Sequence, residues 1–388
     1  MRNALVTTNI ITGNLLYGRD LTKSYPHLVP DSTNAASIQN WISTTCNAAS
    51  QPTESYWATS QAPVYGNVVS MPVSSQKYAG SVLLADGRVL FVPHSASNVG
   101  IYNPTNFTFT AVTPAGFPSG SFKFQGGVLL PDGRVVFIPC ISTAIGIFNP
   151  VNLTYTSGPS VPTGGGDYFR SGVLAPNGNV VMIPSGSTSI AQYNPITNIY
   201  SEMLAHGAGY LAFRNGVLLP NGNVIMIPYT QTYIGQYDPI LNTFTKTSFP
   251  FISSQSFNTG VLAPNGNVVM VPGYAANVCV FNPSASTLSN VGPIGGNIFY
   301  GGALLPTGNI IFFPAGTSNI GMFDPIALTY SNSTSTEIGD GNGACIGGSL
   351  LPSGQVVLTP YTMSNVGVIY TFTPASVEFC LSPYFNKL

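Results

Sequence analysis

One short segment recurs seven times along the chain, and no other feature of the sequence restricts the fold as much. Three clear copies are GGVLLPDGRVVFIP (126–139), SGVLAPNGNVVMIP (171–184) and NGVLLPNGNVIMIP (215–228). A glycine in the same place of every copy measures the period, with successive spacings of 46, 45, 44, 44, 42 and 46 residues. These glycines are Gly87, Gly133, Gly178, Gly222, Gly266, Gly308 and Gly354. A chain with this period is an array of similar units, so its length does not indicate how many ordinary domains it contains.

Each copy is consistent with four strands. The VLL-like and VVFIP-like runs flank Asp-Gly or Asn-Gly in most copies, which predicts a tight hairpin with a type I′ turn. A third run such as IGIFNP (145–150) ends at Asn-Pro or Asp-Pro, because proline cannot donate to a ladder. A Thr- and aromatic-rich fourth strand follows. The first two strands are apolar on successive residues, as strands buried on both faces are. Period and strands together predict an all-β, seven-bladed β-propeller of four-stranded blades.

The phrase QYDPILNTFTKTSFP (236–250) resembles the end-of-blade pattern of the kelch and galactose-oxidase-type propellers. The matching residues are Tyr237, Asp238, Pro239, Asn242 and Thr243. The tryptophan of that pattern is replaced by Phe or Tyr in this chain, so the resemblance implies a divergent kelch-like propeller. The uncharged repeats, of the form PDGRVVFIP…IGIFNP, are also similar in style to propeller-repeat structural proteins of large DNA viruses and phages.

Two segments compete to close the predicted ring. The seventh copy lacks a good fourth strand of its own, and APVYGNVVSM (62–71) lies where a fourth strand precedes the other copies. The rival is VEFCL (377–381), which would complete the last blade from the C-terminal side. We therefore divide the chain into an N-terminal extension, residues 1–61, and the propeller, residues 62–388. The extension is either a cap on the propeller or an arm that anchors it to a larger assembly.

Only 6% of the residues are charged, against about 25% in an ordinary domain. Eleven basic residues cannot supply the cationic surface of a nucleic-acid groove. No apolar run is long enough for a membrane-spanning helix, and the N-terminus lacks the apolar core of a secretory signal. The cysteine spacing fits no metal site, and we expect neither a metal nor another cofactor.

The candidate binding residues occupy one position of the repeat, here called a row. The residue at this position varies from copy to copy, while the residues beside it stay nearly the same. An aromatic residue precedes this row in six of the seven copies, and its regularity indicates packing between blades. The variable residue after it falls where a propeller opens around its central channel. Polar or aromatic side chains there predict a ring of hydrogen-bond donors for a carboxylate, a sugar or a partner loop. The predicted ring consists of Gln125, Arg170, Arg214, Asn258 and Tyr300.

We expect a non-enzymatic structural or receptor-binding component of a virus particle. Its predicted partners are other virion proteins and a host glycan or receptor. A cellular or secreted kelch-like module, a lectin or adhesin, is the alternative. A carbohydrate-active or copper oxidase-like enzyme comes third, because the sequence shows no catalytic motif. The scattered His94 and His206 and the carboxylates Asp167 and Asp340 form no recognisable pair.

Overall fold

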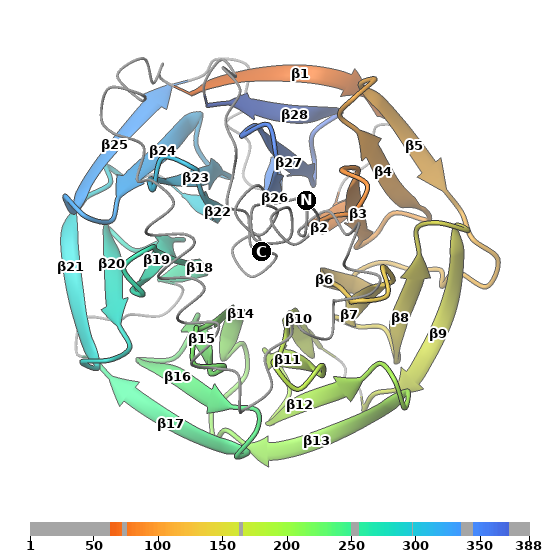
Figure 1. Ribbon diagram of the computed structural model, residues 1–388, viewed down its shortest axis with the longest axis horizontal. Coiled ribbons are helices and arrows are strands. Elements are labelled where there is room, and N and C mark those ends of the chain that lie inside the picture. The colour runs from red at the N-terminus through yellow and green to blue at the C-terminus, as the bar shows by residue number, and fades with distance from the viewer. Residues whose placement is uncertain are drawn as a thin grey trace, which may run out of the picture.

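The described part of the computed structural model forms seven antiparallel sheets of four strands, arranged as blades around a central channel (Figure 1). It comprises residues 63–71, 76–162, 166–249, 256–296, 298–334 and 344–371. The predicted seven-bladed propeller is therefore confirmed. The extension 1–61 and the segment 377–381 lie outside the described residues.

The strands occupy the same four places in every blade. Next to the channel are β2 (Tyr78–Leu83), β6 (Phe124–Leu129), β10 (Phe169–Leu174), β14 (Phe213–Leu218), β18 (Phe257–Leu262), β22 (Phe299–Leu304) and β26 (Cys345–Leu350). Second are β3 (Val89–Pro93), β7 (Val135–Pro139), β11 (Val180–Pro184), β15 (Val224–Pro228), β19 (Val268–Pro272), β23 (Ile310–Pro314) and β27 (Val356–Pro360). Third are β4 (Val99–Asn103), β8 (Ala144–Asn149), β12 (Ser189–Asn194), β16 (Tyr233–Asp238), β20 (Asn277–Asn282), β24 (Asn319–Asp324) and β28 (Asn365–Tyr370). Outermost are β5 (Thr108–Val112), β9 (Thr154–Ser160), β13 (Ile199–Ala205), β17 (Thr243–Ser248), β21 (Thr287–Pro293), β25 (Thr329–Thr334) and β1 (Val64–Ser70).

The ring is closed from the N-terminal side. Strand β1 pairs antiparallel with β28, from Val64 opposite Tyr370 to Ser70 opposite Asn365, and completes the seventh blade (Figure 1). The segment near 62–71 is thus the one that fills the outer place. Pairing the two ends of the repeat array removes the edge that an open ring would expose.

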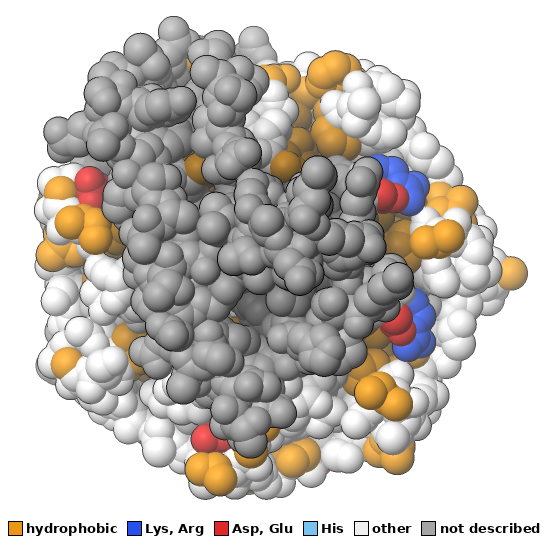
Figure 2. Space-filling view, in the orientation of Figure 1, with side chains coloured by type: hydrophobic (Ala, Val, Ile, Leu, Met, Phe, Trp, Pro, Cys, Tyr) orange, Lys and Arg blue, Asp and Glu red, His pale blue; other side chains and the backbone are white. Residues whose placement is uncertain are grey.

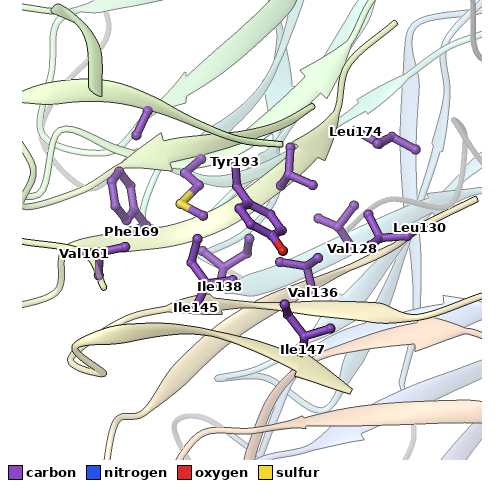
Figure 3. Packing of buried hydrophobic residues seen from close by; sticks show 13 residues of the cluster. Val128, Leu130, Val136, Ile138, Ile145, Ile147, Val161, Phe169, Leu174 and Tyr193 are labelled. Atoms are coloured by element: carbon purple, nitrogen blue, oxygen red, sulfur yellow. The ribbon is translucent and has the colours of Figure 1, made fainter. Parts of the chain in front are cut away.

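Neighbouring blades are joined by apolar layers between their inner strands. Figure 3 shows one layer, in which Val136 and Ile138 of β7 face Phe169 of β10 and Tyr193 of β12. A glycine in each of several channel strands makes room for this layer. A Cβ atom on Gly216 would lie 2.5 Å from Ile183 Cδ1 and 2.8 Å from Val173 Cγ2 of the preceding blade. The glycine of the channel strand is therefore needed for close packing of one blade on the next.

Polar contacts repeat between blades on the face of the a–b hairpins, the turns that join each channel strand to the second strand. Arg88 Nη2 donates to the carbonyl oxygen of Pro150 in the next blade at 3.2 Å, and Arg134 Nη2 to that of Pro195 at 3.3 Å. Asn177 Nδ2 makes the same contact with Pro239 at 3.3 Å. The proline that ends a third strand thus presents its carbonyl to the hairpin of the preceding blade.

The predicted type I′ hairpin turn is wrong. In the first hairpin only Gly87 has a positive φ, of 86°, and Asp86 does not. Gly87 N donates to Leu84 O at 3.0 Å, and Leu84 N donates to Arg88 O at 2.8 Å. These bonds define a three-residue loop, a type I turn followed by a left-handed glycine. Asp86 Oδ1 accepts from Arg88 N at 3.1 Å, which explains the aspartate without requiring a positive φ there.

Substitution of a hairpin glycine tests this turn. Gly178 has φ of 80°, and a Cβ atom there would meet nothing within 4 Å, so only backbone strain opposes a side chain. We expect Gly178→Val to destabilise the fold by about 1–3 kcal/mol, since a β-branched residue resists positive φ. Gly178→Asn is the control and should lose much less, because asparagine tolerates the left-handed region. Chemical denaturation measures both, and equal stability of the two variants would contradict the turn.

Candidate functional site

A β-bulge in each channel strand leaves one or two residues out of the ladder. In β10, Phe169 pairs with Pro184 and Ser171 with Ile183, so Arg170 between them has no cross-strand partner. The same shift leaves Arg214 unpaired in β14, Asn258 in β18 and Tyr300 in β22. A bulge re-aims the side chain at its extra residue. The preceding aromatic residue stays in the core, as predicted: Phe169, Phe213 and Phe299 are 0% exposed.

The bulged residues line a cavity of about 320 Å³ at one mouth of the central channel. Four of the five predicted ring residues, Gln125, Arg170, Arg214 and Tyr300, lie on its wall. Asn258 joins them around a smaller cavity of about 50 Å³, which also reaches the following residues of the same strands. The structure therefore brings all five together.

Sequence analysis missed a second row of residues at the mouth, the ones that follow the proline of each second strand. His94 and Tyr361 occupy this place in the first and seventh blades and line the larger cavity. The row has the same signal as the first, variation beside constant neighbours. Its members are His94, Cys140, Ser185, Tyr229, Gly273, Ala315 and Tyr361.

Arg170 is neutralised by an acidic neighbour. Its Nη2 forms an ion pair with Asp167 Oδ2, and Cys140 Sγ donates to Asp167 Oδ1 at 2.9 Å. Burial acts to raise the pKa of Asp167, but Arg170 and the hydrogen bond from Cys140 outweigh it and hold that pKa below its ordinary value. Burial, with Asp167 beside it, raises the pKa of the Cys140 thiol. At neutral pH the carboxylate is charged, and the thiol is a neutral donor to it.

Arg214 is held in place by three residues that carry no charge. Its guanidinium carbon lies 3.8 Å from the centroid of the Tyr229 ring and 5.2 Å from that of Tyr300. Its Nη1 donates to Asn258 Oδ1 at 2.7 Å, and Asn258 Nδ2 donates to Phe299 O at 2.7 Å. Its Nε is buried without a hydrogen-bond partner among the described residues. Burial, and then the charge of Arg170, lower the pKa of Arg214, but a guanidinium stays protonated.

His94 is neutral at physiological pH. Its ring is 4% exposed, meets Phe122 edge-on with centroids 4.8 Å apart, and lies 5.6 Å from the Tyr361 centroid. Burial lowers its pKa to about 4, and the charges of Arg170 and Lys123 add to that effect. Asp167 and a backbone hydrogen bond with Gln76 oppose it. His206 is also buried, and its Nε2 lies 2.7 Å from the carbonyl oxygen of Ser187.

The depressed pKa of His94 predicts a loss of stability in mild acid. Above pH 6.5 the ring is neutral in both states, and below that the unfolded chain takes up the proton first. Folding should therefore weaken as pH falls from about 6.5 to about 4, by up to about 3 kcal/mol. In His94→Gln this part of the pH slope should disappear, while the part from His206 remains. Urea denaturation at a series of pH values measures the slopes, and identical slopes for variant and wild type would contradict the assignment.

Many solved structures share this fold, and the three described below are distant in sequence. A catalytically inactive virginiamycin B lyase from Staphylococcus aureus, determined with quinupristin, aligns with a TM-score of 0.68 at 12% identity, covering 80% of this chain and 100% of that one. Hydrazine synthase of Kuenenia stuttgartiensis aligns at 0.61 and 14%, covering 79% and 98%. The WD40 propeller of Doa1 gives 0.61 and 11%, covering 79% and 97%. No protein-family model matches the sequence, and no curated protein matches it.

These neighbours correct one prediction. We expected a protein that is not an enzyme, because the sequence carries no catalytic motif. A lyase and a hydrazine synthase share the same propeller architecture, so that exclusion is wrong. At such low identity the likeness shows the fold alone, and propellers host both catalysts and binding modules.

Among the described residues, none forms a helix with the length and hydropathy of a membrane span. Within the same residues, no three His, Cys, Asp or Glu side chains gather as a metal-binding group.

Proposed function

We propose that this protein is a binding propeller that receives a small ligand in the cavity at its channel mouth. The observation that carries the proposal is where the blades differ. Their strands, hairpins and inter-blade layers repeat, whereas the residues that line the cavity change chemistry from blade to blade. The volume of about 320 Å³ falls at the lower end of the range for small-molecule sites, about 300–1,000 Å³.

The wall of the cavity has the character of a binding site. Polar groups converge on it from Gln125, Asp167, Arg170 and Arg214, and aromatic rings from Phe122, Tyr300 and Tyr361. Such sites combine an apolar lining with a few placed polar groups that orient the ligand. The bulges hold four of these residues, Gln125, Arg170, Arg214 and Tyr300, on strands rather than on long loops, which keeps that part of the site rigid.

Blocking the mouth tests the proposal. Ile346 is half-buried and lines both cavities, so Ile346→Trp places an indole in the mouth. The control is Ile326→Trp, the same change at a residue that is 70% exposed on a turn between third and outermost strands. We expect a panel of metabolites and oligosaccharides to raise the melting temperature of wild type and of the control, but not of Ile346→Trp. Equal shifts in both variants, or no shift in wild type, would refute a mouth site.

A second candidate is the structural component of a virus particle that the sequence suggested. It is favoured by apolar side chains on the turns between third and outermost strands: Val151, Ile196, Leu241 and Ile326 are 87%, 91%, 71% and 70% exposed. The described part of the face in Figure 2 carries few charged side chains. Neutral surfaces of this kind suit permanent assembly. Mass spectrometry of purified particles tests it, and recovery of the chain only as a free monomer would count against it.

A further inference from the structure

We infer that the mouth cavity binds a small organic monocarboxylate, with its carboxylate on Arg214 and its apolar part directed across the channel. This inference rests on the proposed function and names its ligand class. Three observations support it: the charge balance of the cavity, the way Arg214 is held, and the side of the channel that faces Arg214.

The described charges on the cavity wall leave one positive charge without a counter-charge. Arg170 and Asp167 form an ion pair and cancel each other. Arg214 forms no ion pair with any carboxylate of the described residues, and its hydrogen bond goes to the neutral Asn258. A cation that is largely removed from water is costly unless an anion joins it. A monoanion restores neutrality, whereas a phosphate dianion would leave an unbalanced negative charge in the same space.

The guanidinium of Arg214 is fixed before any ligand arrives. Tyr229 stacks against it, and Asn258 is itself anchored by its bond to Phe299 O, so its oxygen faces Arg214. A planar guanidinium held in one orientation matches a carboxylate through two parallel hydrogen bonds. Little side-chain entropy is then lost on binding, which favours a small ligand that makes few contacts.

The bulged positions opposite Arg214 carry aliphatic side chains, and the other residues that those two blades contribute to the cavity wall are His94 and Tyr361. Arg214 belongs to the fourth blade, and in a ring of seven the point across from it lies between the seventh and first blades; Figure 1 shows β14 across the channel from β26 and β2. The bulged positions of those two blades carry Ile346 and Ala79, and both line the cavity. A ligand anchored on Arg214 therefore directs the rest of its body toward aliphatic side chains. This arrangement selects a carboxylate with an apolar group over a bare inorganic anion.

Titration of the full chain with four probes tests the inference. Isothermal calorimetry or NMR compares benzoate, hexanoate, the neutral isostere benzamide and inorganic phosphate. We expect benzoate or hexanoate to bind at least tenfold more tightly than benzamide and phosphate. Arg214→Gln should lose at least tenfold in carboxylate affinity. Arg134→Gln, which removes an arginine of a hairpin far from the cavity, should bind as wild type.

A gain-of-binding variant keeps the test decisive if Arg214→Gln folds poorly. Asp167→Asn removes the charge that neutralises Arg170 and leaves two uncompensated guanidinium groups at the mouth. Phosphate affinity should then rise at least tenfold over wild type, and unchanged phosphate binding would overturn the charge balance.

The remaining outcomes separate this inference from the proposed function. If phosphate binds wild type as tightly as the carboxylates, the monocarboxylate assignment is wrong. If benzamide or a neutral sugar binds wild type but not Ile346→Trp, and no carboxylate binds, the mouth is a ligand site and only the anion assignment fails. If neither neutral nor anionic probes bind, both fail.

Discussion

The fold depends on how closely one blade can pack on the next. Seven sheets close into a ring only if each channel strand lies against the side chains of the preceding blade, and Gly172, Gly216 and Gly260 make that approach possible. A Cβ atom on any of the three would lie 2.5–2.6 Å from an isoleucine methyl of its neighbour. The apolar runs of the first two strands follow from the same constraint, because both faces of these strands meet another blade. The hydrogen bonds from the hairpins to the proline carbonyls then connect the same blades at the end of the sheet.

The bulge in the channel strand separates stability from recognition. Without it, strict alternation would commit each position of the strand to one of two packed faces. The extra residue satisfies neither face and points into the channel, so its chemistry changes without disturbing the layers beside it. This explains how Arg170, Asn258 and Tyr300 occupy equivalent places in blades whose cores are nearly identical. The cavity is a consequence of that freedom, repeated around the ring.

Much of the architecture could be predicted because the same sequence pattern occurs in seven copies. Blade number, strand order and the aromatic residue of six of the seven channel strands all follow from period and pattern. The type of hairpin turn could not be determined from the sequence, because type I′ and the observed three-residue loop both place glycine in the left-handed region after Asp or Asn. The choice between the two closing segments needed the pairing of β1 with β28, a contact between residues about 300 positions apart. In the site, the bulged row was found by its variation, whereas Tyr229 and His94 lie just after the predicted second strand, at a position that was not compared between copies.

The scarcity of charge gives Arg214 its importance. In a chain with only eleven basic and twelve acidic residues, few charges stand near enough to offset a cation at the channel mouth. Asp167, the acidic residue on the same cavity wall, is already engaged by Arg170 and Cys140. Because the surrounding walls are tyrosine, asparagine and backbone, the positive potential at the mouth is set by one guanidinium rather than averaged over many groups. On the proposed function, a single arginine without an ion pair would make one small region of this sparsely charged protein selective for an anion.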